Sequence, residues 1–259
     1  MEKIYKRILS FIILPCLVAA FPFLVFADTA SSIPYDWYFK PTTDHSQPVV
    51  CPEADFIDDF NTYYLGPPDQ KDLYLTFDAG FDNGYHIKIL DILKQKNVTA
   101  AFFVDGNFIK TNPDIVKRMA SEGHLVCNHS LKHPDMTKLT DFDSYKKQII
   151  EWENLVSNLG IAPQKYFRFP GGRFSNLALE YNDKLGLKTV FWSFAYYDWD
   201  EKEQPEPAAA LEKINSRLHN GAILLLHSTS KTNAQILSDF IDSSRMQGYT
   251  FKSLDSIEK

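Results

Sequence analysis

The sequence has few cysteines and no cluster of basic residues, and each absence excludes a class of protein. Only three of the 259 residues are cysteine, so the chain can hold at most one internal disulfide. No run of lysine or arginine follows the N-terminus and the formal net charge is -6, which argues against nucleic acid or an anionic membrane as a partner. Internal repeats and low-complexity tracts are also absent. What is present, 44% apolar and 14% aromatic residues, is enough to bury the core of one sizeable domain, so the chain is not disordered.

Residues 1–27 have the pattern of an export signal. A basic start precedes an uncharged stretch over residues 8–26, and Ala27 is the small residue that a signal peptidase requires. The alternative is an uncleaved membrane anchor, because the uncharged stretch approaches the length of a bilayer span. Pro15 and Pro22 interrupt a straight helix and favour cleavage. In either case we expect the domain to work outside the cytoplasm, secreted and associated with the cell wall.

Two cysteines remain after such a cleavage, Cys51 and Cys127. A disulfide between them is chemically allowed in an oxidising compartment. Cys127 lies in a short apolar stretch, however, and the favoured interpretation is a small buried side chain.

From Leu73 onward, short apolar segments alternate with segments of helical periodicity. The predicted strands are 73–77, 100–104, 125–128, 166–169, 189–194, 222–226 and 250–252. The predicted helices are 85–96, 113–122, 142–159, 176–185, 207–218 and 234–247. Seven strands that alternate with helices are typical of a parallel α/β fold, either a barrel or a doubly wound sheet. Residues 28–70 lack this periodicity, and we interpret them as an N-terminal extension packed on a single domain over residues 71–259.

Polar, reactive residues stand where several predicted strands end. Asp78, His129 and His227 each follow directly on such a strand, and Arg168 lies at the end of the predicted strand 166–169. The carboxyl ends of parallel strands form one face of the fold, and that face carries the active site. We therefore expect these side chains to converge in space, which indicates an enzyme.

Each of these residues also has an ordinary structural interpretation. His129 and His133 are four residues apart, so in a helical turn they share a face and can bind one metal ion. Histidines at this spacing are, however, often plain surface residues. Asp78 can be a general base or a cap for the next segment. Arg168 can be a salt-bridged residue in a turn, and His227 either a general acid or a strand cap.

Five segments in this order resemble the motifs of the polysaccharide deacetylases of carbohydrate esterase family 4, the NodB-homology domain. They are Thr76 to Gly80, His129 to His133, Arg168 to Gly172, Asp198-Trp199 and Leu225 to His227. The resemblance runs from about Leu73 to the end of the chain. It implies a distorted (β/α) barrel with about seven parallel strands.

The resemblance also implies a role for each residue of these segments. Asp78 is expected to be the base that activates a water, with Arg168 holding its carboxylate. His227 is expected to protonate the departing amine, with Asp198 orienting its ring.

Metal and substrate contacts follow from the same resemblance. His129 and His133 are expected to ligate a divalent metal, zinc or a similar ion, which polarises the acetyl carbonyl and lowers the pKa of a water. The expected substrate contacts are Trp199 on the apolar side of the acetyl pocket, the backbone N–H of Gly171 at the oxyanion, and Leu225.

Two positions depart from the family pattern. Ala79 stands where relatives carry the aspartate that is the third metal ligand, so we expect a weakly bound metal. Asp82 is near enough in sequence to be a candidate substitute, and a metal-free site is the alternative. Gly171 stands where many relatives have tyrosine, although its backbone N–H is retained.

Because it lacks the metal-binding aspartate, the chain resembles the sporulation enzymes that form muramic δ-lactam in spore cortex. Further similar segments are 37–40, 63–66, 189–193 and 227–233. This resemblance implies de-N-acetylation of N-acetylmuramic acid in peptidoglycan strands without stem peptides, by a protein that we expect to be a monomer. The alternatives are a deacetylase of N-acetylglucosamine in peptidoglycan or chitin-type oligomers, an esterase of O-acetylated glycans, and an inactive glycan-binding module.

Overall fold

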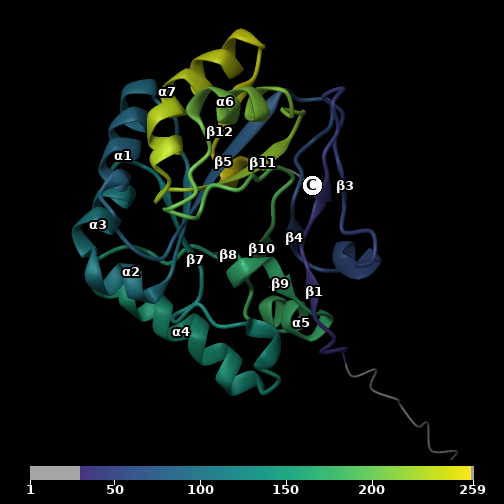
Figure 1. Ribbon diagram of the computed structural model, residues 1–259. Coiled ribbons are helices and arrows are strands. Elements are labelled where there is room, and N and C mark those ends of the chain that lie inside the picture. The colour runs from purple at the N-terminus through teal and green to yellow at the C-terminus, as the bar shows by residue number, and fades with distance from the viewer. Residues whose placement is uncertain (1–29, 258–259) are drawn as a thin grey trace, which may run out of the picture.

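The computed structural model of the protein describes residues 30–257 (Figure 1). The predicted export signal lies outside the described residues. One sheet of eight strands dominates the fold, in the order β11-β5-β6-β7-β8-β10-β4, with β12 also paired to β5. All strand pairings in this sheet are parallel. Its strands are β4 (Thr62–Tyr63), β5 (Asp72–Ala79), β6 (Ala101–Val104), β7 (Leu125–Asn128), β8 (Tyr166–Phe167), β10 (Lys188–Val190), β11 (Ala222–His227) and β12 (Thr250–Lys252).

Among the described residues, seven α-helices flank the sheet. They are α1 (Tyr85–Lys96), α2 (Gly106–Thr111), α3 (Pro113–Ser121), α4 (Phe142–Asn158), α5 (Asn176–Lys184), α6 (Pro207–Asn215) and α7 (Lys231–Met246). In Figure 1, α1, α3, α2 and α4 follow one another around one side of the sheet, while α6 and α7 cover its other end. Within residues 30–257, no helix is long and apolar enough to cross a membrane.

The sheet curves back toward its own first strand. The chain leaves β10, and Phe194 then forms a parallel bridge with Leu224 in β11. The backbone N–H of Leu225 donates to the carbonyl of Phe194 over 2.8 Å. This contact gives the distorted barrel that the family resemblance implies. The chain bends after Val190, so the observed strand Lys188–Val190 has three residues, where the sequence predicts a strand over 189–194.

The segment before β5 contributes to the same architecture. β4 adds an eighth strand to the main sheet, next to β10. Two short antiparallel pairs also involve this segment, β1 (Tyr35–Asp36) with β9 (Arg173–Phe174) and β2 (Phe39–Lys40) with β3 (Val49–Val50). Trp37 packs against Phe191 with their ring centroids 4.2 Å apart. The weak periodicity of residues 28–70 gave no signal for these two-residue strands.

Side chains of the central strand alternate between two environments. In β5, Leu73, Leu75 and Phe77 pack in the core beneath the helices, whereas Tyr74 belongs to a separate cluster inside the barrel. Because successive strand residues point to opposite faces, Asp78 is the next inward side chain after Tyr74 and residue 76. The last inward position of β5 is thus a carboxylate at the open end of the barrel.

Side-chain caps fix the start of several helices. Ser230 accepts a hydrogen bond from the N–H of Asn233 and begins α7, and Asp141 accepts one from Ser144 and begins α4. Asp105 caps α2 through a 2.7 Å bond from the N–H of Phe108. The sequence did not predict α2, because six residues are too few for helical periodicity to show.

The two described cysteines are both buried and both carry free thiols. Cys127 is fully buried inside the barrel, in a different core cluster from Cys51. The favoured interpretation of Cys127 as a small core residue fits this placement, and the alternative disulfide is not formed.

Candidate active site

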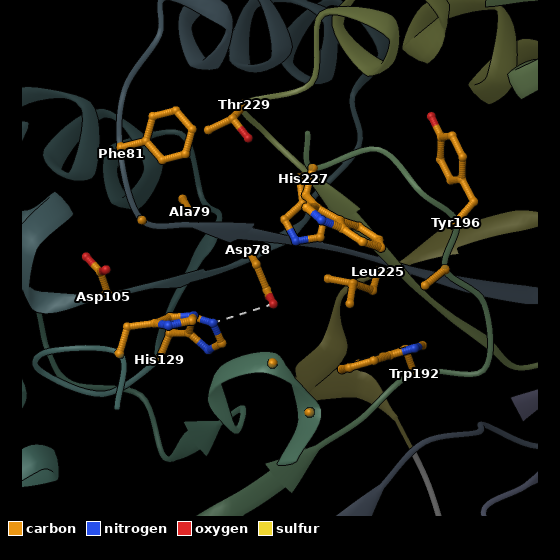
Figure 2. Close-up of a pocket in the computed structure, with 16 residues that line it drawn as sticks. Asp78, Ala79, Phe81, Asp105, His129, Trp192, Tyr196, Leu225, His227 and Thr229 are labelled. Carbon is orange, nitrogen blue, oxygen red and sulfur yellow. Dashed lines mark ion pairs between the residues drawn. The ribbon is translucent and has the colours of Figure 1, made fainter. Parts of the chain in front are cut away.

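A pocket of about 670 Å³ opens at the carboxyl ends of the strands (Figure 2). It is lined by Asp78, His129, His133, Gly171, Trp199, Leu225 and His227 among the residues that the sequence singled out. Arg168 and Asp198 are fully buried behind its wall. The structure therefore brings together all nine predicted site residues, either in the pocket or in contact with a residue that lines it.

Asp78 is held by a buried arginine. Its Oδ1 accepts a 2.8 Å hydrogen bond from Nη1 of Arg168, whose Nε donates to the carbonyl of Val190. Burial by itself would raise the pKa of Asp78, but the positive charge of Arg168 outweighs it and lowers the pKa below its usual value. The carboxylate is therefore ionised at neutral pH.

His227 is positioned directly across from Asp78. The two residues are register partners on the neighbouring parallel strands β11 and β5. Nδ1 of His227 donates to Oδ1 of Asp198 over 2.7 Å, and its backbone N–H donates to Oδ2 over 2.8 Å. Burial would lower the pKa of His227, but Asp198 outweighs it and raises the pKa above the usual value. These bonds leave Nε2 of His227 available to a molecule bound in the pocket.

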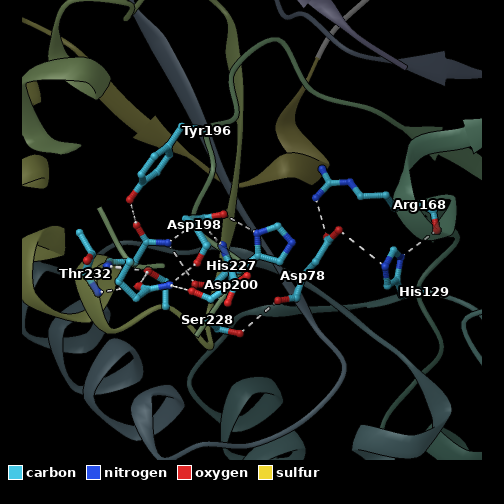
Figure 3. A network of polar contacts seen from close by, with 12 residues as sticks. Asp78, His129, Arg168, Tyr196, Asp198, Asp200, His227, Ser228 and Thr232 are labelled. Atoms are coloured by element: carbon cyan, nitrogen blue, oxygen red, sulfur yellow. Dashed lines mark hydrogen bonds and ion pairs between the residues drawn. The ribbon is translucent and has the colours of Figure 1, made fainter. Parts of the chain in front are cut away.

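A second layer of side chains holds Asp198 in turn (Figure 3). The amide of Asn233 donates to Oδ2 of Asp198 over 2.6 Å and to the carbonyl of His227 over 3.1 Å. The hydroxyl of Tyr196 donates to Oδ1 of Asn233. The sequence did not assign a role to Asn233 or Tyr196. Asn233 lies in the first turn of α7, three residues after the cap Ser230, and its partner Asp198 lies on a distant loop, so the sequence around Asn233 gives no signal.

The histidine pair lies in a loop and not in a helical turn, the geometry in which the i, i+4 spacing would place both rings on one face. Ser130 and His133 have φ values of +67° and +53°, which no helix allows. The two rings nevertheless come together, with centroids 4.9 Å apart. Nδ1 of His129 donates to the carbonyl of Arg168 over 3.0 Å, since a carbonyl can only accept. Nε2 of His129 then carries the lone pair, 3.6 Å from Oδ2 of Asp78.

These two imidazoles suit a divalent metal. Burial is the main reason that the pKa of His129 falls to about 4, so the ring is neutral and its Nε2 can donate electrons to a cation. Ala79 supplies no ligand, and among residues 30–257 no group of three or more histidine, cysteine or acidic side chains is placed to hold a metal. The residues present fit a metal that has two protein ligands and takes its others from elsewhere.

Asp82 does not replace the missing aspartate. Its Oδ1 accepts the N–H of Gly84 over 2.9 Å and contacts Nδ1 of His86 over 3.1 Å, and it does not line the pocket. The acidic residue that does line the pocket, besides Asp78, is Asp105. Burial raises the pKa of Asp105. Its sequence context, the end of a predicted strand, was the signal that could have identified it.

Aromatic side chains form the walls of the pocket. Trp199 is 52% exposed, and its ring centroid lies 6.0 Å from that of His227. Trp192, which the sequence left without a role, also lines the pocket and lies below Leu225 in Figure 2. Gly172 has a φ of +70°, and a Cβ there would stand 2.6 Å from the Trp192 ring, so only glycine fits.

Comparisons with known proteins agree with this site. Residues 65–190 match the sequence model of the polysaccharide deacetylase family. The peptidoglycan-N-acetylmuramic acid deacetylase PdaA of Bacillus subtilis is 39% identical over 238 residues, which cover 89% of this chain and 88% of PdaA. The solved structure of PdaA, described as a family 4 carbohydrate esterase, superposes with a TM-score of 0.84 over 88% of this chain and 97% of that chain.

Two further relatives bear on activity. A peptidoglycan-N-acetylglucosamine deacetylase of Bacillus cereus is 35% identical over 191 residues, covering 72% of this chain and 66% of the relative. A structure of a family 4 pseudoenzyme from Bacillus anthracis is 28% identical, with a TM-score of 0.70 over 76% of this chain and 68% of that chain. With PdaA similar along nearly its whole length, the chain belongs to the polysaccharide deacetylases of carbohydrate esterase family 4, hydrolases that act on amide bonds.

Proposed function

We propose that the protein removes the acetyl group from N-acetylmuramic acid in peptidoglycan strands that have lost their stem peptides. The freed amine then lies next to the lactyl carboxyl group, with which it closes the muramic δ-lactam. The pairing of Asp78 and His227 is the observation that supports amide hydrolysis. They face one pocket from adjacent strands, and buried partners shift their pKa values in opposite directions.

The two residues divide the proton transfers of amide hydrolysis. Asp78, ionised at neutral pH, accepts a proton from the attacking water as its oxygen bonds to the acetyl carbon. His227 donates a proton from Nε2 to the amine nitrogen as the carbon–nitrogen bond breaks. Asp198 keeps Nδ1 protonated and stabilises the imidazolium. Acetate and a free sugar amine are the products.

Other residues position the substrate and stabilise charge. The backbone N–H of Gly171, in the turn that follows Arg168, is proposed to donate to the carbonyl oxygen as it becomes negative. Trp199 and Leu225 line the pocket and offer apolar surface to the acetyl methyl group. Arg168 keeps the base ionised and immobile.

A divalent metal, zinc or a similar ion, would be held by His129 and His133. When bound there, it would polarise the acetyl carbonyl as a Lewis acid. Since Ala79 leaves only two protein ligands, we expect binding to be weaker than at a site with three.

The muramic acid substrate is supported by the similarity to PdaA and by the departure at Ala79. Action on peptidoglycan places the protein outside the cytoplasm, on the cell wall, which agrees with the expected export signal. A deacetylase of N-acetylglucosamine is the second candidate, favoured by the Bacillus cereus relative. An inactive glycan-binding module is the third, favoured by Ala79 and by the pseudoenzyme.

Mass spectrometry of glycans after incubation with the protein separates these candidates. The glycans are peptide-free peptidoglycan, N-acetylglucosamine oligomers and an O-acetylated xylan, each with and without added zinc. Loss of acetyl groups from muramic acid alone supports the proposal. Loss of acetyl groups from the N-acetylglucosamine oligomers or from the xylan identifies that glycan as the substrate instead. Loss from none of the three, with glycan binding retained, identifies a binding module.

A further inference from the structure

We propose that a second, smaller pocket beside the active site binds a neighbouring sugar of the same glycan strand. This inference rests on the proposed function, because it assumes that the active-site pocket takes an acetylated sugar within a longer chain. The second pocket measures about 170 Å³ and is lined by Asn83, Tyr85, Glu201, Gln204, Thr229 and Lys231. Thr229 lines both pockets, so an occupant of one lies next to an occupant of the other.

Three loops from the active-site end of the barrel meet in this pocket. The amide of Asn83, from the loop after β5, donates to Oε1 of Glu201 over 2.8 Å and to the carbonyl of Thr229 over 2.7 Å. Glu201 belongs to the loop that carries Asp198, and Thr229 to the loop that follows His227. The second pocket is therefore built from the same loops as the catalytic acid and its partner.

Hydrogen bonds fix the side chain of Gln204 in the lining of the second pocket. Gln204 donates from Nε2 to the carbonyls of Asp198 and Asp200, and its Oε1 accepts from the hydroxyl of Ser230 over 2.7 Å. Both ends of the Gln204 amide are thus engaged in holding the loops. A preformed polar surface of this kind loses little conformational entropy when a ligand binds.

Several other polar groups that line the second pocket can still form hydrogen bonds with a ligand. The side-chain carbonyl oxygen of Asn83 is buried and has no hydrogen-bond partner in the part of the chain that the structure describes. The Tyr85 hydroxyl and the Lys231 ammonium likewise contact no partner within residues 30–257, and Glu201 has one carboxylate oxygen unengaged. Buried polar groups normally find partners, so the unpartnered carbonyl oxygen of Asn83 in the second pocket points to a ligand that donates a hydrogen bond.

A sugar ring suits this mixture of donors and acceptors. Its hydroxyl groups both donate and accept, and so can bond the Glu201 carboxylate as well as the Lys231 ammonium. Its apolar faces need flat apolar surface, which exposed aromatic rings offer. Phe81 and Trp199 are 44% and 52% exposed, line the active-site pocket, and each lies two residues before a residue of the second pocket. Exposed aromatic side chains gathered at a polar-rimmed site mark a binding surface.

The test measures how much affinity the protein gains from glycan length. Dissociation constants would be determined by NMR titration for N-acetylmuramic acid and for a peptide-free peptidoglycan tetrasaccharide, using the Asp78→Asn variant so that neither ligand is turned over. The double variant Tyr85→Phe/Lys231→Met, made in the same background, removes two hydrogen-bonding groups and keeps their apolar parts. We expect it to bind the tetrasaccharide about tenfold more weakly, so that the gain over the single sugar largely disappears.

Lys202→Met is the matched control, since Lys202 is exposed, lies next to Glu201 and lines neither pocket. It should keep the full gain with length. An equal gain in the double variant and the control would overturn the inference while leaving the proposed function intact. Repeating the series with N-acetylglucosamine and its tetramer tests separately whether the proposed substrate is wrong. If only these ligands bind, the substrate proposal is wrong, and the double variant still shows whether the second pocket holds a sugar.

Discussion

Substituting Asp198 by asparagine should weaken the catalytic acid without changing the shape of the site. In the native structure the carboxylate accepts three hydrogen bonds, two from His227 and one from Asn233. Asparagine has one acceptor oxygen, which best replaces Oδ2 because two donors converge there. Its NH₂ group then faces Nδ1 of His227 and favours the tautomer that carries its proton on Nε2.

The magnitude follows from the bond that is lost. A hydrogen bond to a charged group contributes about 1.5–3 kcal/mol, which corresponds to a fall of about 1–2 units in the pKa of His227. Because Asp198 raises this pKa, native His227 stays protonated to higher pH than a free histidine, and activity declines as pH rises through the raised pKa. In Asp198→Asn the alkaline limb of the pH–rate profile should move about 1–2 pH units toward acid.

The assay is acetate release as a function of pH, expressed as kcat/KM. Asp200→Asn provides the control, because Asp200 is two residues away and contacts Tyr197 and the backbone of Lys202 instead of His227. Its alkaline limb should stay in place. If Asp198→Asn kept both the rate and the position of the alkaline limb, His227 would not be the acid that Asp198 tunes.

Three other changes test separate parts of the structure. Asp78→Asn should reduce kcat by about 10²–10⁴-fold with an unchanged circular dichroism spectrum, and substantial residual activity would reject Asp78 as the base. Ala79→Asp should bind zinc at least about tenfold more tightly by calorimetry, because it adds a carboxylate at the pocket, and equal affinity would show that the metal uses other ligands. Cys127 is buried and its pKa is raised by burial, so a thiol reagent should modify it only after denaturation, and fast labelling of the folded protein would contradict its placement.

Much of the barrel was predictable, because its strands and helices carry local signals. The helix Tyr85–Lys96 was predicted with its observed bounds, since Ile89, Leu90 and Leu93 repeat at helical spacing and bury one face. The strand Leu125–Asn128 was also predicted as observed. β4 was not, because a two-residue strand has no periodicity and exists only through its pairing with β10.

The site was predictable to the extent that strand ends converge. Asp78 and His227 follow from this rule, since parallel strands place their carboxyl ends together. The histidine pair shows the limit of spacing arguments. The i, i+4 spacing would bring the two rings together on a helix, but here they meet in a loop with left-handed backbone at Ser130 and His133. Asn233 in α7 and Tyr196 in the loop after β10 depend on contacts between segments far apart in the sequence, which no local pattern encodes.

The most direct test of the central claim is the reaction itself, followed on peptide-free peptidoglycan in water enriched in heavy oxygen. Wild-type protein should release acetate that carries one heavy oxygen, leaving muramic acid as the free amine or its lactam, whereas Asp78→Asn should release almost none. Acetate release that is equally fast from both proteins, or none from wild type with zinc supplied, would contradict a hydrolysis driven by Asp78 and His227.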